Sequence, residues 1–176
     1  MSETTAIDLR HFIRDIPNFP KPGILFRDIT PLLASPPAFR ASVDRLCENY
    51  RDQEIDVIVA AEARGFIFAA PMALEFGVSF VPIRKPGKLP YERHSHVYDL
   101  EYGSDTLEMH IDGVNPGQKV LVVDDLLATG GTVDACCQLL QKCGADIVGC
   151  AFVIELIDLG GAKSLEKFKP FSLIRY

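Results

Sequence analysis

The stretch KVLVVDDLLATGGT, residues 119–132, decides the fold because it joins an apolar segment, a polar turn and the start of a helix. Residues 119–123 form a nearly continuous apolar run, which is typical of a strand covered on both faces. A helical pattern follows over residues 132–143 and ends at Gly144. The stretch therefore predicts a strand, a turn and a helix, which is the repeating unit of an α/β protein.

Segments of the same kinds recur along the chain. Three more runs rich in β-branched residues predict strands at residues 56–60, 78–83 and 147–154. Apolar residues at helical spacing predict helices over residues 6–15, over residues 66–76, and from the N-cap Ser35 to Tyr50. Strands that alternate with helices predict a three-layer α/β fold, with a mainly parallel, twisted sheet flanked by helices.

We expect one domain over residues 1–176, because that length suits a single core and the chain contains no repeat or linker. Within it, residues 1–34 are expected to form a short helix and a small hood. Residues 84–96 are expected to form a flexible lid loop, since a loop of this length in a compact domain is usually functional. In such folds the ligand lies beyond the carboxyl ends of the strands.

The composition argues against several classes of function. The net charge of −6 disfavours a general nucleic-acid binder, whose affinity comes largely from neutralising phosphates. The sequence has no apolar run of the roughly 20 residues that cross a membrane, and its start lacks a signal-peptide pattern. The five cysteines form no CxxC pair, so we expect buried thiols rather than a zinc site or disulfides. We therefore expect a cytoplasmic protein that binds neither membranes nor nucleic acid.

Two acidic residues, Asp124 and Asp125, directly follow the apolar run. Adjacent carboxylates are costly unless cations or hydroxyls meet them, and a small glycine-containing turn before a helix can direct backbone N–H groups at an anion. The combination predicts a phosphorylated sugar, with hydroxyls at the aspartates and phosphate in the turn. In the alternative, the aspartates are solvated and the glycines only make a turn. The stretch is neither a Walker A loop nor a GxGxxG motif.

Residues 122–132 resemble the phosphoribosylpyrophosphate-binding signature of the type I phosphoribosyltransferases. The resemblance implies that Asp124 and Asp125 hold the ribose 2- and 3-hydroxyls. It also implies that the following turn cradles the 5-phosphate through Ala128, Thr129, Gly130, Gly131 and Thr132. The fold that it implies is the type I phosphoribosyltransferase fold.

Four more blocks are similar to the adenine phosphoribosyltransferases, in the family's order and over nearly the whole chain: residues 19–29, 62–66, 83–90 and 100–103. The resemblance implies transfer of the 5-phosphoribosyl group from 5-phosphoribosyl-1-pyrophosphate (PRPP) to adenine, giving AMP and pyrophosphate. It also implies a homodimer. Magnesium, Mg²⁺, is expected to be carried mainly by the substrate rather than by direct protein ligands.

Two stretches of the chain are expected to contact the pyrophosphate. Glu62, Ala63 and Arg64 follow a strand, where an arginine and backbone N–H groups can bind phosphate; in the family this is the pyrophosphate loop, often with an unusual peptide conformation. Many relatives have serine at the position of Ala63. The alternative makes Arg64 a surface charge paired with Glu62.

In the lid, the resemblance implies that three cations reach the pyrophosphate of a neighbouring subunit: Arg84, Lys85 and Lys88. The alternative is a solvated run of charges. His94 and His96 are interpreted as solvated loop histidines rather than metal ligands, because nothing near them completes a metal-binding pattern.

Glu101, just after the lid and beside Tyr102, is the candidate for proton transfer. The resemblance places it at the purine N7, although a surface position on a strand is the alternative. Phe26 is expected to stack on adenine, with backbone groups around Arg27 at the base edge and Leu159 nearby, as the family implies. Without the resemblance, Phe26 would be interpreted as a core residue.

Two competing functions remain open from the sequence. The first keeps the fold and changes the base to hypoxanthine, guanine, xanthine or orotate, because recognition by main-chain groups leaves little trace in a sequence. The second is a non-catalytic regulator that senses PRPP. Such regulators usually need a DNA-binding segment or a basic face, whereas this chain is acidic.

Overall fold

The computed structural model describes residues 7–99 and 103–176. The chain divides into an N-terminal unit that ends at Arg45 and a C-terminal unit, Leu46–Tyr176. The boundary falls inside helix α2 (Pro36–Tyr50). The presence of α2 confirms the helix predicted after Ser35. One domain over residues 1–176 and a hood over residues 1–34 stay predictions.

The C-terminal unit is built on a five-stranded parallel sheet with the order β4-β3-β7-β8-β9. Its strands are β3 (Val57–Ala61), β4 (Ser79–Ile83), β7 (Lys119–Leu127), β8 (Asp146–Glu155) and β9 (Pro170–Arg175). All five residues of β3 are buried, which explains their continuous apolar run. The predicted α/β sheet is confirmed.

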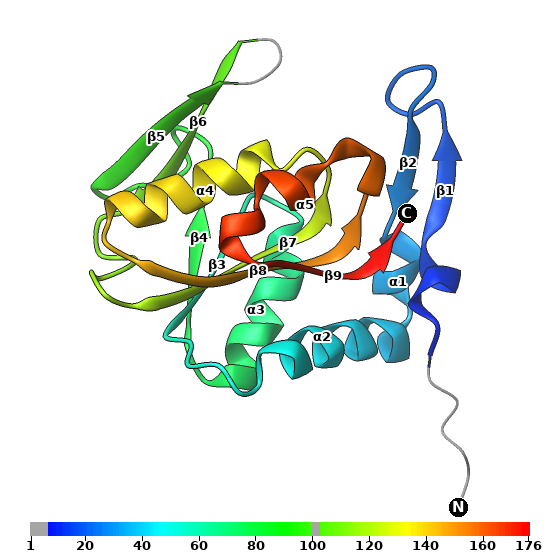
Figure 1. Cartoon of the computed structure of the whole chain (residues 1–176), viewed down its shortest axis with the longest axis horizontal. Helices are drawn as coiled ribbons and strands as arrows, with labels where there is room; N and C mark the ends of the chain where they lie inside the picture. The colour runs from blue at the N-terminus through cyan, green and yellow to red at the C-terminus, as the bar shows by residue number, and fades with distance from the viewer. Residues whose placement is uncertain (1–6, 100–102) are drawn as a thin grey trace, which may run out of the picture. The chain divides into compact units, whose positions relative to one another are not determined.

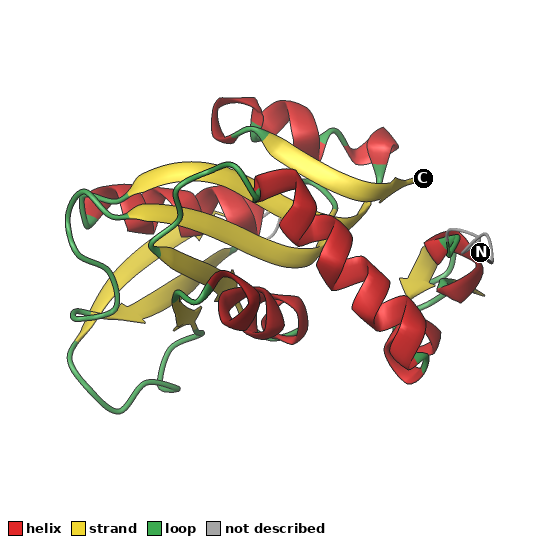
Figure 2. Ribbon diagram, turned by 90° about the horizontal axis from the view of Figure 1, so that it is seen from below, coloured by secondary structure: helices red, strands yellow, loops and turns green. Residues whose placement is uncertain are grey.

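The two main connections of the sheet run in opposite directions. The chain passes from β3 through α3 (Gly65–Phe76) outward to β4, and from β7 through α4 (Gly131–Lys142) outward to β8 on the other side. Since parallel crossovers are right-handed, helices reached in opposite directions cover opposite faces of the sheet. Figures 1 and 2 show this layering, with α3 on one face and α4 on the other.

Strand β7 continues four residues beyond the predicted end at residue 123. Pairing with β8 persists past that point, with Asp124 opposite Phe152 and Leu127 opposite Glu155. The two aspartates are therefore held in a strand rather than in the turn after it. The strand exceeds its prediction because the neighbouring strand supplies hydrogen-bond partners for polar residues as well as for apolar ones.

The segment predicted as a lid loop is shorter than expected. Residues from 93 onward belong to β5 (Arg93–Asp99), which pairs antiparallel with β6 (Ser104–His110). The loop prediction was wrong for residues 93–96, because pairing with a later strand is invisible in a polar local sequence. Residues 84–92 remain between β4 and β5, and we call them the basic segment.

In the N-terminal unit, the helix predicted over residues 6–15 was wrong. Only η1 (Leu9–Phe12) is helical, as a single 3₁₀ turn capped by the Asp8 side chain. The next residue, Ile13, is extended, and β1 (Arg14–Pro17) pairs antiparallel with β2 (Leu25–Asp28). Helix α1 (Thr30–Ala34) follows β2. Short elements of the C-terminal unit were also not predicted: η2 (Ile157–Leu159), α5 (Gly161–Ser164), η3 (Glu166–Phe168) and β9.

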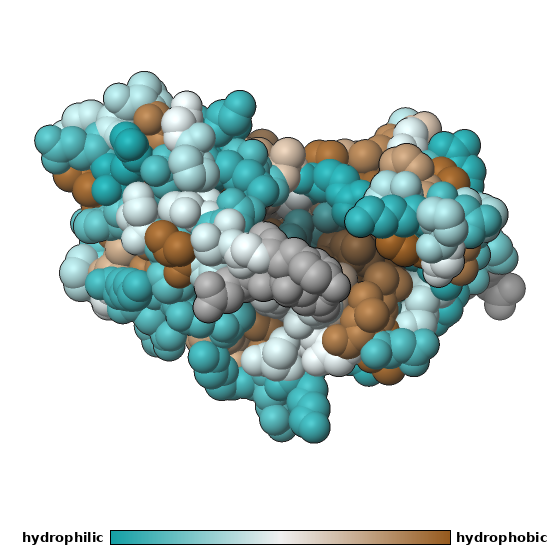
Figure 3. Space-filling view, turned by 90° about the horizontal axis from the view of Figure 1, so that it is seen from above, coloured by the Kyte–Doolittle hydropathy of each residue, from teal (hydrophilic) through white to brown (hydrophobic). Residues whose placement is uncertain are grey.

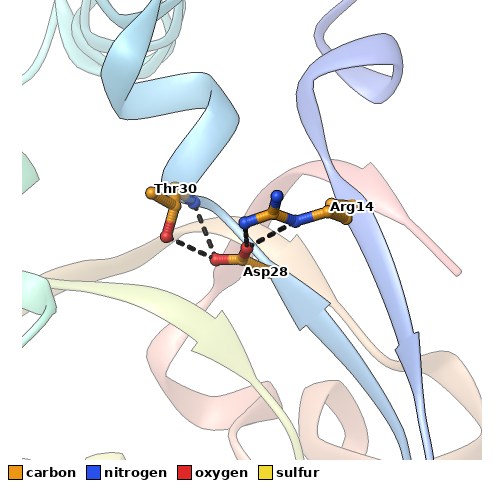
Figure 4. Close-up of polar contacts among 3 residues, drawn as sticks. All are labelled: Arg14, Asp28 and Thr30. Atoms are coloured by element: carbon orange, nitrogen blue, oxygen red, sulfur yellow. Dashed lines mark hydrogen bonds and ion pairs between the residues drawn. The ribbon is translucent and has the colours of Figure 1, made fainter.

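Asp28 ties the hairpin of the N-terminal unit to the start of α1 (Figure 4). Its carboxylate accepts hydrogen bonds from Arg14 Nε at 2.9 Å, Thr30 N at 2.9 Å and Thr30 Oγ1 at 2.6 Å. The side-chain and backbone hydrogen bonds of Thr30 are the largest causes that lower the pKa of Asp28 to about 2, with Arg14 adding to them.

We expect Asp28→Asn to destabilise the protein at pH 7 by on the order of 1–3 kcal/mol, because the charged acceptor is lost. A carboxyl whose pKa is lowered by folding stabilises the fold at any pH above its pKa in the unfolded state, which is near 4. This contribution disappears as the pH falls toward 2. Thermal unfolding of the two proteins between pH 7 and pH 2.5 should therefore show a difference that shrinks on acidification. Asp44→Asn, which removes only an exposed pair with Arg40, is the control and should cost at most about 0.5 kcal/mol. A constant difference at every pH would contradict this role for Asp28.

Candidate functional site

The carboxyl ends of β3 and β7 meet where the chain connections of the sheet diverge. Adjacent strands whose crossovers leave in opposite directions form a crevice, the usual ligand site of an open α/β sheet. Here a cavity of about 240 Å³ lies at those strand ends. Two chain segments line it, residues 62–64 after β3 and residues 124–133 at the end of β7. The structure thus brings ten of the predicted site residues together: Glu62, Ala63, Arg64, Asp124, Asp125, Ala128, Thr129, Gly130, Gly131 and Thr132.

The two aspartates at the end of β7 differ in surroundings. Asp125 is 4% exposed, and its Oδ2 lies 3.0 Å from Arg64 Nε but accepts no hydrogen bond within the described residues. Burial raises the pKa of Asp124, and the neighbouring Asp125 carboxylate raises it further. Burial also raises the pKa of Asp125, while the charge of Arg64 opposes that rise. The pair is therefore costly to ionise without a ligand that donates hydrogen bonds.

The turn after β7 leads into the N-terminus of α4. Gly130 is the N-cap and has φ +86°, a left-handed conformation that favours glycine. The start of a helix of this length offers backbone N–H groups and a favourable dipole to an anion. The geometry therefore suits the phosphate predicted for residues 128–132.

Helix α5 supports this turn, although no local sequence pattern connects the two segments. Ser164 Oγ donates to the carbonyl of Thr129 at 3.0 Å. A Cβ added at Gly161 would lie 2.3 Å from the carbonyl oxygen of Ala128, so only glycine allows the two segments to approach this closely. The only available sequence signal was the glycine pair at residues 160–161.

Gly65 has a similar function on the other side of Asp124. A Cβ at this position would lie 2.8 Å from Asp124 Oδ1 and 2.9 Å from the Val123 carbonyl oxygen. Glycine at the start of α3 therefore lets the helix pack directly on β7. We expect Gly65→Ala to displace the Asp124 carboxylate.

The peptide bond between Glu62 and Ala63 is cis, in agreement with the unusual conformation expected at this loop. The Glu62 carboxylate accepts hydrogen bonds from Arg84 Nε at 2.8 Å and from the Lys85 backbone N–H at 3.0 Å. Partial burial acts to raise the pKa of Glu62, but the hydrogen bonds from Lys85 and Arg84 outweigh it and lower this pKa. The observed contacts of Glu62 are thus with the basic segment, and binding of pyrophosphate by Glu62 stays a prediction.

The basic segment holds its cations close to carboxylates. Lys85 Nζ donates to Asp105 Oδ2 at 2.7 Å, and this hydrogen bond is the main cause that raises the pKa of Lys85. Lys88 is exposed. Arg84, Lys85 and Lys88 do not line the cavity, although the hydrogen bonds of Glu62 connect Arg84 and Lys85 to it.

The remaining predicted residues belong to other elements or fall outside the described residues. Glu101 falls outside the described residues. Phe26 and Arg27 belong to β2, where the ring of Phe26 packs edge-to-face on Phe19 and Arg27 pairs with Asp15. Leu159, in η2, is half-exposed and does not line the cavity. The contacts of these residues with adenine stay predictions.

His96 is not the solvated loop residue that was predicted. It lies on β5, is only 9% exposed, and its Nδ1 is 2.8 Å from Lys142 Nζ of α4. The correction follows from the strand pairing described above, which turns this side chain toward α4. His94 is exposed, as expected. Four of the cysteines are buried thiols and Cys143 is partly exposed.

Comparison with known proteins agrees with this site. A family model described as phosphoribosyl transferase domain matches residues 32–172. The chain therefore belongs to the phosphoribosyltransferase family.

The relatives are more specific. An adenine phosphoribosyltransferase of Rhodopirellula baltica is 61% identical over 170 residues, which cover 97% of this chain and 82% of the relative. The crystal structure of the adenine phosphoribosyltransferase of Thermoanaerobacter pseudethanolicus has 49% identity and a TM-score of 0.92, and the match covers 96% and 98% of the two chains. The Saccharomyces cerevisiae enzyme, crystallised with adenine and an imino-altritol bisphosphate, has 40% identity, a TM-score of 0.88 and coverage of 94% and 96%. Within the phosphoribosyltransferases, the chain belongs with the adenine phosphoribosyltransferases.

Asp124 should destabilise the ligand-free fold at neutral and alkaline pH. A carboxyl whose pKa is raised by folding lowers the free energy of unfolding. This effect grows as the pH rises above the pKa of the carboxyl in the unfolded chain, which is about 4. We therefore expect Asp124→Asn to raise the melting temperature at pH 8.5 by about 2–4 °C, and by less at pH 5. Scanning calorimetry at both values tests this.

The exposed Asp112→Asn is the control for the loss of a carboxyl as such. The ribose contact predicted for Asp124 would reverse the order in the presence of PRPP, because Asp124→Asn would lose that contact and with it stabilisation by the ligand. If Asp124→Asn is less stable than wild type at pH 8.5 without ligand, the ionised Asp124 side chain does not destabilise the fold.

Proposed function

We propose that this chain is a pentosyltransferase of purine salvage, which transfers the 5-phosphoribosyl group from PRPP to adenine and releases AMP and pyrophosphate. The observation that carries the proposal is the cavity at the switch point of the sheet, where two carboxylates precede an anion-binding turn. The similarity to adenine phosphoribosyltransferases over 97% of the chain supports adenine as the base.

The orphaned acceptor of Asp125 fits a sugar hydroxyl. Its buried Oδ2 accepts no hydrogen bond in the described residues, and a hydroxyl group would supply one without adding charge. Asp124 and Asp125 would then hold the 2- and 3-hydroxyls, while the turn at residues 128–132 holds the 5-phosphate. This placement fixes both ends of the ribose and orients its anomeric carbon.

The pyrophosphate would leave on the side of the positive charges. Arg64 lines the cavity, and the basic segment is tied to the same loop through Glu62. Adenine N9 bonds to the anomeric carbon while the bond between that carbon and the pyrophosphate oxygen breaks. The electron pair of the broken bond leaves with pyrophosphate. Cations placed there stabilise the charge that develops on pyrophosphate in an oxocarbenium-like transition state. Glu101 would accept the proton that N7 of the base loses as N9 forms the new bond.

The oxygen-rich edge of the cavity fits magnesium. Mg²⁺ prefers oxygen ligands and commonly takes one or two carboxylates together with substrate phosphates. The described residues contain no cluster of three or more His, Cys, Asp and Glu side chains that could hold a metal ion by themselves. Asp124 and Asp125, which line the cavity, could offer carboxylate oxygens to a magnesium ion carried by PRPP. When bound, it would offset charge on the leaving group.

A homodimer and a cytoplasmic location belong to the same proposal. The homodimer rests on the resemblance of residues 83–90 to the adenine phosphoribosyltransferases. In the described part of the chain, no helix is both long and apolar enough to cross a bilayer.

The first test is adenine-dependent release of pyrophosphate from PRPP and magnesium. A panel of adenine, guanine, hypoxanthine, xanthine and orotate should give turnover mainly with adenine. Turnover of guanine without adenine would reject the choice of base. Binding of PRPP without any base-dependent release would favour the non-catalytic sensor instead.

Replacing Glu101 with Gln should lower kcat by about 10²-fold or more while changing the KM for PRPP by less than about threefold, because proton transfer is lost and sugar binding is kept. Steady-state kinetics with both substrates measure this. Glu166→Gln, at an exposed glutamate, is the control. An equal loss in kcat and PRPP affinity would remove Glu101 from the acid–base role.

A further inference from the structure

The basic segment, residues 84–92, carries three cations within five positions, and contacts with carboxylates fix its conformation. Arg84, Lys85 and Lys88 repel one another, and a loop with this charge would spread if nothing opposed it. Glu62 and Asp105 hold the first two cations through the hydrogen bonds described above. Within residues 7–99 and 103–176, no hydrogen bond or ion pair fixes the side chain of Lys88, so its position depends on the backbone on either side of it.

Glu108, on β6, contacts this segment at two places. Its backbone exchanges a pair of hydrogen bonds with Arg84, at 2.9 and 2.8 Å, which extends the pairing of β6 beyond the β5–β6 hairpin. Its carboxylate Oε2 accepts from the Gly87 backbone N–H at 3.3 Å. Glu108 is only 4% exposed. The face of the molecule shown in Figure 3 is mainly hydrophilic, with apolar residues gathered in part of it.

The other oxygen of Glu108 is engaged by the hairpin. Oε1 accepts from Arg93 Nε at 2.9 Å and, more weakly, from Ser95 Oγ at 3.5 Å. Burying a carboxylate is costly unless it is paired, and Arg93 supplies the pairing charge. Pairing within the hairpin needs only Oε1. The contact of Oε2 with Gly87 therefore serves the basic segment rather than the hairpin.

Lys88 lies between two fixed residues. On one side is Gly87, which has φ +77° and donates its N–H to Glu108. On the other is Leu89, which is 8% exposed and anchors the chain in the protein. The flanking prolines, Pro86 and Pro90, further restrict the backbone. Because the backbone on both sides of Lys88 is already restricted, the chain loses less conformational entropy when the ammonium group binds an anion than an unrestrained loop would lose.

We propose that Glu108 is a positioning residue for pyrophosphate binding, because its carboxylate fixes the Gly87 amide and so sets the direction of Lys88. The inference rests on the proposed function, in which Lys88 meets the pyrophosphate of PRPP. Glu108 itself touches neither substrate nor leaving group. Its effect should therefore fall on PRPP binding and spare the base.

Two variants of equal side-chain length separate the acceptor from the packing. Glu108→Met fills the same space without an acceptor, and we expect it to raise the KM for PRPP by about fivefold to tenfold, with the KM for adenine unchanged. Glu108→Gln keeps an oxygen that can accept from Gly87 and should stay within about threefold of wild type. Glu92→Gln, an exposed carboxyl in the same segment, is the matched control.

Amide hydrogen exchange reads the contact directly and needs no activity. Exchange of the Gly87 amide should be faster in Glu108→Met than in wild type, and unchanged in Glu92→Gln. If Glu108→Met is unstable because Arg93 loses its partner, the double variant Arg93→Met/Glu108→Met leaves no unpaired charge and gives the same comparison.

The outcomes separate the inference from the function beneath it. If Lys88→Ala raises the KM for PRPP while Glu108→Met changes neither this KM nor the exchange of Gly87, the positioning role is wrong and the proposed function stands. Equal effects of the Gln and Met variants on the KM would also overturn it, since the acceptor would then be irrelevant. Absence of adenine-dependent pyrophosphate release in the wild-type protein would instead reject the proposed function.

Discussion

The confinement of two carboxylates at the end of β7 is the constraint on which the rest of the site depends. Asp124 and Asp125 are held in the sheet by pairing with β8, so they cannot move apart to relieve their repulsion. Arg64 lies near one of them, but the hydrogen-bonding capacity of Asp125 Oδ2 remains unused in the described structure. A ligand rich in hydroxyl groups is the natural partner for such a pair, because it donates hydrogen bonds and brings no competing charge.

Close packing around the pair makes this confinement rigid. Gly65 lets the start of α3 lie directly against Asp124, and Gly161 lets α5 lie against the turn after β7. A side chain at either position would collide with backbone atoms or with the carboxylate. The glycines thus let α3 and α5 pack closely beside the segments that line the cavity, and this close packing leaves little room for the aspartates to relax.

Charge in this protein is arranged locally and against its overall sign. The chain has a net charge of −6, yet Arg64 and the basic segment place cations beside the cavity. Three carboxylates hold the basic segment: Glu62 accepts from Arg84, Asp105 from Lys85, and Glu108 from the Gly87 amide. Under the proposed function, acidic groups therefore have two separate uses, one toward the sugar and one in orienting the positive groups for a phosphorylated leaving group.

The sequence alone determined the elements whose signals are local. Continuous apolar runs predicted β3, β4, β7 and β8, helical spacing predicted α2, α3 and α4, and the residues from Asp124 to Thr132 predicted the sugar-phosphate site. The resemblance to a known family added the residues of the pyrophosphate loop. Such signals survive in a sequence because side-chain periodicity and turn composition act within a few residues.

Tertiary structure decided what depends on partners distant in the chain. Strand β7 extends through its aspartates because β8 pairs with them, and the β5–β6 hairpin replaces part of a predicted loop and buries His96. Gly161 lies against the turn after β7 from more than thirty residues further along the chain, and Glu108 reaches Gly87 from another strand. These contacts could not be predicted because polar strands and close approaches carry no local pattern; they exist only once the chain has brought the partners together.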